Sequence, residues 1–303
     1  MRVYPEMKCR RCKNPAVIKM TRHNTAYCGF CFQFYIYDQV RRALTEYKML
    51  KKKEPVLVAV SGGKDSLALW DILIKLGYPA VGLHLNLGIG AYSEASQNKV
   101  ETFARSKNLQ LITHAYQEAH GLGVVDIARE TARPACSACG TMKRYHFNRI
   151  ARENGFAVVA TGHNLDDEAA RLMGNVLQWQ EHYLQKQSPA LSAKDGKWAK
   201  KIRPLYRLTE REIAAYAVIT RIDYIVEECP MSKGAKMFLY KEALNKLEEA
   251  SPGTKHRFYL GFLQKKKEIL SPQEENNQCC QSCGQPTRGE SCSYCRLMER
   301  VAT

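Results

Sequence analysis

Short apolar runs alternate with longer stretches of mixed polarity through the middle of the chain. Four apolar runs predict buried strands, at residues 56–60, 80–86, 109–114 and 157–161. Four mixed stretches predict helices, at residues 67–76, 93–107, 139–154 and 209–221. Strands that alternate with helices predict an α/β fold with a doubly wound parallel sheet, covered on both faces, whose ligand lies at the carboxyl ends of the strands.

The turn after the first strand is rich in backbone donors. It has the sequence Ser61-Gly62-Gly63-Lys64-Asp65-Ser66. Paired glycines let the main chain approach a ligand, and the N–H groups and the following helix N-terminus attract negative charge. The spaced G-x-x-x-x-G-K-[ST] pattern is absent, so this is not a Walker A loop. The turn predicts a phosphate site, with a nucleotide as the leading candidate.

The predicted sheet also places the rest of the nucleotide. We expect Ser61, Asp65 and Ser66 to face the phosphates, directly or through Mg²⁺, which prefers oxygen ligands. Lys64 is expected to face solvent. By analogy with similar folds, the adenine would lie across the strand ends, near the backbone of Ala59, Val60 and Leu85, with Gly162 allowing close approach.

A second polar turn follows the strand at 157–161 and reads Gly-His-Asn-Leu-Asp-Asp-Glu. Asn164 suits a helix N-cap, and acidic residues in the first turn suit the helix dipole. This structural interpretation accounts for Asp166 and Glu168 about as well as a catalytic one does. His163 and His84 are expected to be structural.

Composition and charge narrow the class of protein. The chain has 303 residues and 45% hydrophobic content, enough for one large domain with small appendages. A net charge of +16 favours a polyanion such as nucleic acid, although a lysine-rich thermophile is an alternative. We expect residues 186–201 to form an exposed loop that could touch RNA. Neither a run of about 18 apolar residues nor a signal-type segment is found, which predicts a cytoplasmic protein without a membrane span.

Ten of the twelve cysteines occur in C-x-x-C pairs. Two pairs near each terminus predict two four-thiolate zinc ribbons, with Cys9, Cys12, Cys28 and Cys31 in the first and Cys280, Cys283, Cys292 and Cys295 in the second. A redox dithiol is the alternative for any single pair. Cys279 lies one residue out of register and is expected to take no part.

The middle pair, Cys136 and Cys139, has no second pair nearby, and Cys229 is the only other central thiol. Three thiolates suit zinc with a water, or a [4Fe-4S] cluster with one iron open to another ligand. Cys229 could equally be a buried core residue. The residues alone leave these alternatives open.

Four motifs in order carry a family resemblance: the terminal C-x-x-C pairs, S-G-G-K-D-S, C-S-A-C, and T-G-H-N-L-D-D-E. From Cys9 to Cys295 the chain resembles the TtcA/TtuA family of tRNA 2-thiolation enzymes, and within it the TtuA branch. This family belongs to the PP-loop N-type ATP pyrophosphatases and is related to archaeal and eukaryotic wobble-uridine thiolases. The resemblance implies ATP, Mg²⁺ and the release of AMP and pyrophosphate.

The resemblance also implies the site residues and partners. Cys136, Cys139 and Cys229 would hold a [4Fe-4S] cluster, and Lys143 and Asp167 would be the catalytic pair, with Lys143 also near the α-phosphate. Sulfur would come from a ubiquitin-like carrier protein with a C-terminal thiocarboxylate. The substrate would be tRNA, at uridine 54 or alternatively the wobble uridine 34, and the enzyme would be a homodimer.

The expected organisation is an N-terminal zinc ribbon at 1–34, a helical linker at 35–54, a PP-loop thiolation domain at 55–270 and a C-terminal zinc ribbon at 271–303. Two other functions remain open. One is a different adenylating PP-loop enzyme, such as a lysidine-type tRNA ligase or an amidotransferase domain. The other is a non-catalytic zinc-ribbon RNA-binding protein that senses nucleotide.

Overall fold

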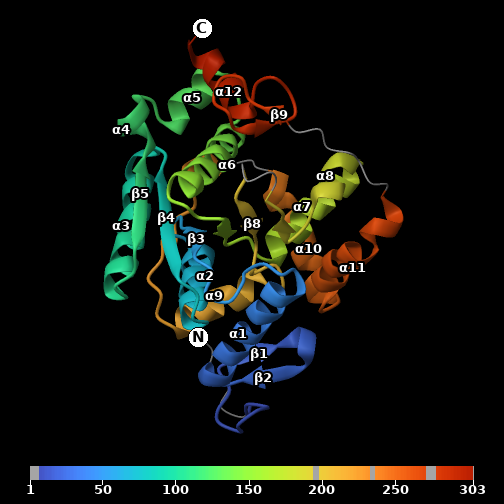
Figure 1. Cartoon of the computed structure of the whole chain (residues 1–303). Coiled ribbons are helices and arrows are strands. Elements are labelled where there is room, and N and C mark those ends of the chain that lie inside the picture. The colour runs from blue at the N-terminus through green and yellow to red at the C-terminus, as the bar shows by residue number, and fades with distance from the viewer. Residues whose placement is uncertain (1–6, 194–197, 233–235, 271–277, 303) are drawn as a thin grey trace.

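A six-stranded sheet forms the centre of the protein (Figure 1). The computed structural model describes residues 7–193, 198–232, 236–270 and 278–302. The strands, in the order β5-β4-β3-β6-β8-β7, are β3 (Val56–Ala59), β4 (Ala80–Asn86), β5 (Leu111–Ala115), β6 (Val158–Thr161), β7 (Ala190–Leu191) and β8 (Lys200–Ile202). All neighbours pair in parallel except β7, which runs antiparallel to β8. The predicted doubly wound sheet is confirmed, with an antiparallel edge strand added.

The chain direction across the sheet reverses at β3. From β3 the chain moves through β4 to β5, and then returns to the other side of β3 as β6 and β8. The carboxyl ends of β3 and β6 therefore lie at a topological switch point, where α/β sheets bind ligands. Both polar turns singled out in the sequence follow these two strands.

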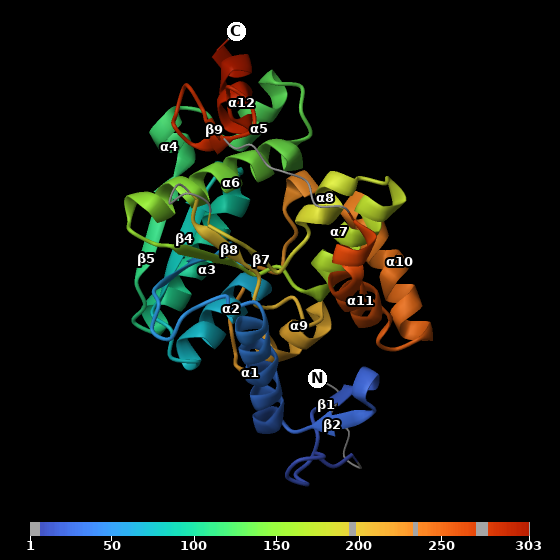
Figure 2. The same ribbon diagram turned by 45° about the vertical axis from the view of Figure 1, so that its right-hand side comes forward.

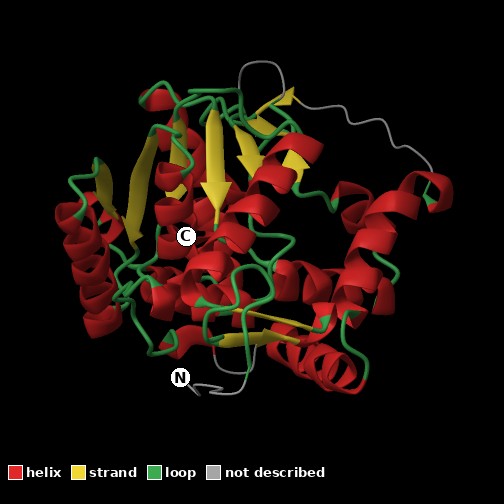
Figure 3. Ribbon diagram, turned by 90° about the horizontal axis from the view of Figure 1, so that it is seen from below, coloured by secondary structure: helices red, strands yellow, loops and turns green. Residues whose placement is uncertain are grey.

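Twelve helices are found in the described part of the chain. Their bounds are α1 (Gly29–Glu46), α2 (Lys64–Lys75), α3 (Gly90–Ser106), α4 (Tyr116–His120), α5 (Val124–Glu130), α6 (Ala135–Glu153), α7 (Leu165–Leu177), α8 (Glu181–Lys186), α9 (Glu210–Ile219), α10 (Lys236–Ala250), α11 (Thr254–Ile269) and α12 (Ser293–Ala302). Figure 3 shows helices around the central strands.

Alternate residues of β3 point into two separate cores. Val56 and Val58 join the core that includes α1, α2, α3, α7 and α9, whereas Leu57 joins the core of α4, α5, α6 and α12. All three side chains are fully buried. A strand that is apolar on both faces reflects a sheet covered on both sides, which is why the sequence shows a continuous apolar run there.

Three helices, α2, α3 and α6, begin three or four residues earlier than the apolar pattern predicts. Helix α2 starts at Lys64, because Gly63 is its extended N-cap and the turn itself supplies the first helical residues. Helix α6 starts at Ala135, directly after Pro134, whose fixed φ suits a helix start. The central C-x-x-C pair consequently lies on the first turns of α6 rather than before the helix.

The prediction of an exposed loop over residues 186–201 is wrong in part. This segment supplies β7 and the first residues of β8, and Gln187 and Ala199 are buried. Its short strands were missed because two or three residues give no periodic pattern. Residues 194–197 of the predicted loop lie outside the described residues.

Two small cysteine modules lie at opposite ends of the molecule (Figures 1 and 2). The first contains the hairpin β1 (Ile18–Met20) and β2 (Thr25–Tyr27), and α1 connects it to the sheet. The second contains β9 (Gln278–Cys279) and β10 (Pro286–Thr287), and its helix α12 packs on α5 and α6. The predicted residues 271–277 of this module lie outside the described residues. Within the described chain, no helix combines the length and apolarity needed to cross a bilayer.

Candidate active site

The turn after β3 is held by its own side chains. The Ser61 N–H donates to Ser66 Oγ at 3.1 Å, and Ser66 Oγ donates to the Gly63 carbonyl at 3.0 Å. Gly62 has a φ of +77°, and a Cβ there would lie 2.6 Å from the Ser96 carbonyl oxygen. Only glycine fits this position. We call this tightly packed turn, residues 61–66, the phosphate loop.

The turn after β6 locks onto this loop. A Cβ on Gly162 would lie 2.9 Å from the backbone nitrogen of Ser66, so the close approach expected at Gly162 is made to the loop itself. Asn164, which is 1% exposed, donates from Nδ2 to Asp65 Oδ1 at 3.0 Å and caps α7 through its oxygen. Sequence reasoning identified Asn164 only as a cap, because its bond to Asp65 crosses ninety-nine residues of chain.

A chain of ion pairs runs along this edge of the sheet. Lys64 Nζ contacts Asp65 at 3.1 Å and Glu210 at 2.7 Å, and Lys241 Nζ contacts Glu210 at 3.2 Å and Asp167 at 2.6 Å. The expectation that Lys64 faces solvent is therefore wrong, because two carboxylates hold its ammonium group. Lys241 was missed because nothing in its local sequence marks it.

The predicted catalytic residue Asp167 is fully engaged in this network. Its Oδ2 accepts from the Asn164 N–H at 3.0 Å, and its Oδ1 pairs with Lys241. Burial raises the pKa of Asp167, but the charges of Lys241 and His163 outweigh burial and leave this pKa below its usual value. The carboxylate therefore stays ionised and is a weak proton acceptor.

The neighbouring acidic residues have structural partners. Asp166 is ion-paired with Lys255 and accepts from the Glu210 N–H at 2.8 Å. Glu168 is 0% exposed and accepts from Tyr259 at 3.0 Å and Arg203 at 3.2 Å. These contacts support the structural interpretation of both carboxylates, which join α7 to α9, α11 and the loop after β8.

A cavity of about 120 Å³ opens beside the phosphate loop. Its lining includes the predicted nucleotide residues Ala59, Val60, Ser61 and Leu85 together with Lys143, Cys139, Cys229 and His84. Asp167, Asp65, Ser66, Gly62, Gly63 and Gly162 are not among the described residues that line it. The cavity thus joins the strand ends to two of the three central thiols.

Helix periodicity and one backbone bond bring the three central cysteines to this place. Cys136, Cys139 and Lys143 are spaced by three and four residues on α6, so they share one helix face. The Ile225 N–H donates to the Gly62 carbonyl at 2.9 Å, which holds the segment that leads to Cys229 against the loop. Cys136 Sγ donates to the Met231 carbonyl at 3.3 Å, close to Cys229 in the chain.

The central thiols are a fitting donor set for a group larger than one ion. Burial and the nearby Cys139 and Cys229 raise the pKa of Cys136. Among the described residues, these three sulfurs do not form a set that lies entirely within 4.8 Å, as the terminal cysteines do. A wider spacing suits a cluster of several iron atoms better than a single ion.

His84 was expected to be structural, but it lines the cavity. Its Nδ1 donates to the Val60 carbonyl at 2.9 Å, and its buried Nε2 has no hydrogen-bond partner among the described residues. Burial lowers the pKa of His84, and the charge of Lys143 lowers it further against the opposing bond to Val60. A neutral imidazole with Nδ1 protonated leaves a free lone pair on Nε2.

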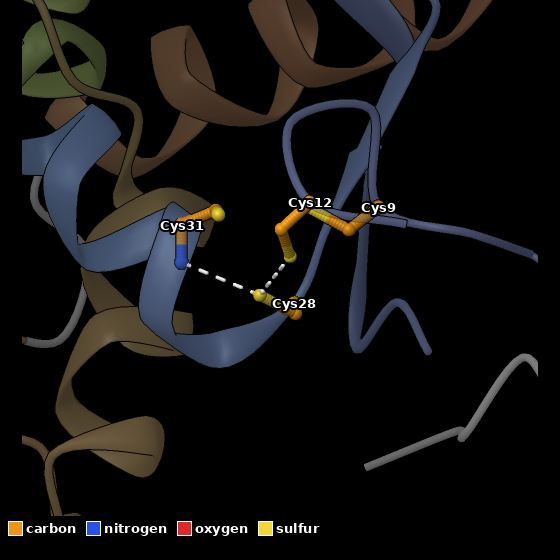
Figure 4. A group of neighbouring side chains, drawn as sticks. All are labelled: Cys9, Cys12, Cys28 and Cys31. Atoms are coloured by element: carbon orange, nitrogen blue, oxygen red, sulfur yellow. Dashed lines mark hydrogen bonds between the residues drawn. The ribbon is translucent and has the colours of Figure 1, made fainter. Parts of the chain in front are cut away.

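The N-terminal cysteines converge on one point (Figure 4). The sulfurs of Cys9, Cys12, Cys28 and Cys31 all lie within 4.8 Å of one another. Burial raises the pKa of Cys9, but backbone N–H groups, led by that of Cys28, lower it to about 6. Four close thiols with one already favoured as thiolate match a tetrahedral zinc site.

The C-terminal cysteines repeat this arrangement. Cys280, Cys283, Cys292 and Cys295 lie within the same 4.8 Å limit. The Cys292 N–H donates to Cys280 Sγ at 3.2 Å, and despite burial such backbone donors lower the pKa of Cys280 to about 6. Cys279 is exposed and outside the group.

A second, basic cavity of about 330 Å³ lies between α6, β8 and the C-terminal module. Arg144, Lys186, Trp198, Lys201, Arg288 and Arg296 are among its lining residues. Burial and the charges of Arg144 and Arg203 lower the pKa of Lys201 to about 8. Crowded cations of this kind attract an anion.

Comparison with known proteins agrees with this geometry. A family model for the PP-loop domain matches residues 36–234, and one for the N-terminal LIM domain of the 2-thiouridine synthetase TtuA matches residues 8–33. A tRNA-5-methyluridine(54) 2-sulfurtransferase of Thermus thermophilus is 49% identical over 97% of this chain and 92% of its own. The chain belongs to the PP-loop tRNA 2-sulfurtransferase family.

Other members of the tRNA 2-sulfurtransferase family match over similar lengths. The Pyrococcus horikoshii tRNA-5-methyluridine(54) 2-sulfurtransferase is 44% identical over 96% of this chain and 93% of its own. Among solved structures, the U34-tRNA thiolase NcsA from Methanococcus maripaludis with its [4Fe-4S] cluster superposes with a TM-score of 0.84 at 26% identity, covering 97% of this chain and 96% of its own.

Proposed function

We propose that the chain is an ATP-dependent tRNA-uridine 2-sulfurtransferase, which adenylates the C2 oxygen of a uridine and replaces that oxygen with sulfur. The observation that carries this proposal is the cavity beside the phosphate loop, because it holds Lys143, Cys139 and Cys229 at the strand ends. A nucleotide site and a thiol site that share one wall suit a reaction in which an activated oxygen leaves and sulfur enters.

The first step forms a bond between the uridine O2 and the α-phosphorus of ATP and breaks the bond to the β-phosphate, so that pyrophosphate leaves. The N3 proton must depart as O2 becomes an ester oxygen. A sulfide then adds to C2, AMP leaves with the original oxygen, and the sulfhydryl proton moves to N3. Adenylation is required because an oxide leaves a pyrimidine poorly, whereas AMP leaves readily.

Side chains of the cavity would assist these steps. We assign Lys143 to the negative charge that develops at the α-phosphate. His84 Nε2 would accept the N3 proton, since it has no hydrogen-bond partner among the described residues and His84 is one of the residues that line this cavity. Asp167 would act indirectly, by pairing with Lys241 and closing the cap of α7.

Cys136, Cys139 and Cys229 would hold a [4Fe-4S] cluster, which when bound can carry a sulfide on its open iron. The fit rests on the donor set, because two thiols lie on one face of α6, a third lies on a segment tied to the phosphate loop, and Cys139 and Cys229 line the cavity. From the family resemblance we propose that a carrier protein thiocarboxylate supplies the sulfur, and that the enzyme is a homodimer.

Metal ions complete the proposal. Mg²⁺ would accompany the ATP phosphates, near Asp65 and Asp167. Burial raises the pKa of Asp65, and the charge of Asp167 raises it further against the opposing charge of Lys64. The two four-cysteine groups would each hold one structural Zn²⁺. None of the twelve cysteines is in a disulfide within the described residues, which suits the reducing cytoplasm, where we place the enzyme.

The basic cavity is the proposed contact for tRNA. Its lining joins residues of α6, β8 and the C-terminal module, and Lys201 Nζ lies 5.1 Å from the Trp198 ring centroid. Cations beside an aromatic face suit a phosphate backbone and an unstacked base. A target uridine would leave its stack to reach the cavity beside the phosphate loop.

We place the modification at position 54. Relatives named for this position are 49% and 44% identical, whereas the structural neighbour named for position 34 is 26% identical. The test is nuclease mapping by mass spectrometry of tRNA from a strain that lacks the gene, and from the same strain complemented with it. Sulfur should return to position 54 only, and its return to position 34 would establish the alternative.

A further inference from the structure

Three histidines gather on the face of the sheet opposite α2 and outside the cavities described above. His114 is on β5, His120 on α4 and His146 on α6. One ring nitrogen from each lies within 4.8 Å of the others. Three imidazole side chains from three different elements thus converge on one point, and their spacing in the sequence did not predict this.

The hydrogen bonding of this group is incomplete. His146 is 1% exposed, yet neither of its ring nitrogens has a hydrogen-bond partner among the described residues. The buried His114 Nε2 is also unpartnered. A buried polar atom without a partner destabilises the folded protein. The His114 and His146 rings stack at a centroid distance of 5.1 Å, so their unpartnered nitrogens lie in the same buried place.

The surrounding side chains do not supply the missing partners. Tyr116 and Tyr294 hydrogen-bond to each other at 3.0 Å, and Tyr145 stacks on Tyr294 at a centroid distance of 3.9 Å. Burial, together with the positive charge of Arg149, lowers the pKa of all three histidines. The rings are therefore neutral at physiological pH, the form in which imidazole binds metal.

We propose that His114, His120 and His146 form a binding site for a divalent transition metal, with Zn²⁺ as the first candidate. Three imidazoles leave one coordination position for water, and His120 is the exposed member through which the ion would enter. A bound ion would join β5, α4 and α6 next to α12. This site is separate from the two four-cysteine groups and the three central thiols.

Co²⁺ tests this proposal because its visible absorption spectrum distinguishes histidine ligands from thiolate ligands. Co²⁺ is added anaerobically to purified protein that keeps its zinc and its iron–sulfur cluster. We expect one additional Co²⁺ per chain, with visible d–d bands but without the near-ultraviolet charge-transfer band that thiolate ligands produce. Binding with a thiolate band, or the absence of an additional Co²⁺, would overturn the proposal.

Two variants and one control make the assignment specific. His120→Ala removes an exposed ligand at little risk to folding, and His146→Phe fills the buried position with an apolar ring. Each should weaken Co²⁺ binding by at least about tenfold, since loss of even a supporting residue costs a metal site that much. The control, His182→Ala, alters a partly exposed histidine on α8 outside the three-histidine group and should bind Co²⁺ like the unchanged protein. Equal binding by all three variants would refute the site.

Discussion

At the scale of single residues, the two nitrogens of His84 have different tasks. Nδ1 donates to the Val60 carbonyl, which fixes the ring, and the buried Nε2 has no hydrogen-bond partner among the described residues. His84→Asn keeps a donor near the Nδ1 position and removes the acceptor. We expect turnover to fall about 100-fold, the lower range for loss of a general base, with little change in the KM for ATP. Steady-state AMP release in the presence of tRNA measures both values.

The pH profile separates this role from a structural one. The lowered pKa of His84 means that Nε2 is a base above that pKa and is protonated below it. Activity should therefore persist at the ordinary histidine value of 6.5 and decline only at the lower pH that matches the lowered pKa, and His84→Asn should lack this decline. An unchanged acidic limb in the variant would exclude His84 as the acceptor. His182→Asn, at a partly exposed position that does not line the cavity beside the phosphate loop, serves as the control.

The sequence identified residues whose chemistry is local. Cysteine spacing gave both terminal thiol groups, and the S-G-G-K-D-S turn gave the phosphate loop. It did not predict the partners of Lys64 and Asn164, because these contacts join segments about a hundred residues apart or more. His84 was missed for a related reason, since a lone histidine in an apolar strand has no local mark of function.

At the scale of elements, the contact between the turn after β6 and the phosphate loop sets the nucleotide site. Gly162→Ala would place a methyl group 2.9 Å from the backbone of Asp65 and Ser66, so the loop must move. We expect a loss of about 1–3 kcal/mol in unfolding free energy and a raised KM for ATP. Urea unfolding and ATP titration measure these effects.

Helix α11 offers a matched glycine. Nothing lies within 4 Å of a Cβ added at Gly261, so Gly261→Ala should stabilise the helix by about 0.5–1 kcal/mol and leave the KM for ATP unchanged. Similar KM values for ATP in Gly162→Ala and Gly261→Ala would show that the phosphate loop does not depend on its contact with the turn after β6. Elements were predicted well where their apolar runs were long, as in β4, and poorly for the short β7 and β8.

At the scale of the whole molecule, basic side chains from distant parts of the chain line one cavity where the C-terminal module meets α6 and β8. Lys201→Met should weaken tRNA binding. It should also reduce the slope of log K against log salt concentration by about one, because one fewer counterion is released on binding. The pKa of Lys201 is lowered to about 8, so its charge is present below this pH and lost above it. Binding by the unchanged protein should weaken as the pH rises through about 8, and the variant should show less of this change.

An exposed lysine on α10 provides the control for this experiment. Lys246→Met removes a cation paired only with Glu242 one turn away and should change the salt dependence little. Equal slopes for the two variants would place the tRNA elsewhere. Fluorescence anisotropy with labelled tRNA over a salt series measures both. The net charge of +16 follows from composition, but the basic cavity could not be predicted, because its lining residues meet only in the folded chain.

The central claim at this scale is that Cys139 and Cys229 lie beside the phosphate loop and help to hold the cluster. Anaerobic protein reconstituted with iron and sulfide should contain about four irons per chain for one [4Fe-4S] cluster, and should convert ATP and tRNA into AMP and 2-thiolated tRNA. Cys229→Ser should lose both the cluster and thiolation, while Cys279→Ser, at an exposed cysteine outside the metal groups, keeps both. The decisive measurement is thiolated nucleoside per chain by mass spectrometry in the Cys229→Ser protein. None is expected, and full thiolation by that variant would contradict the account.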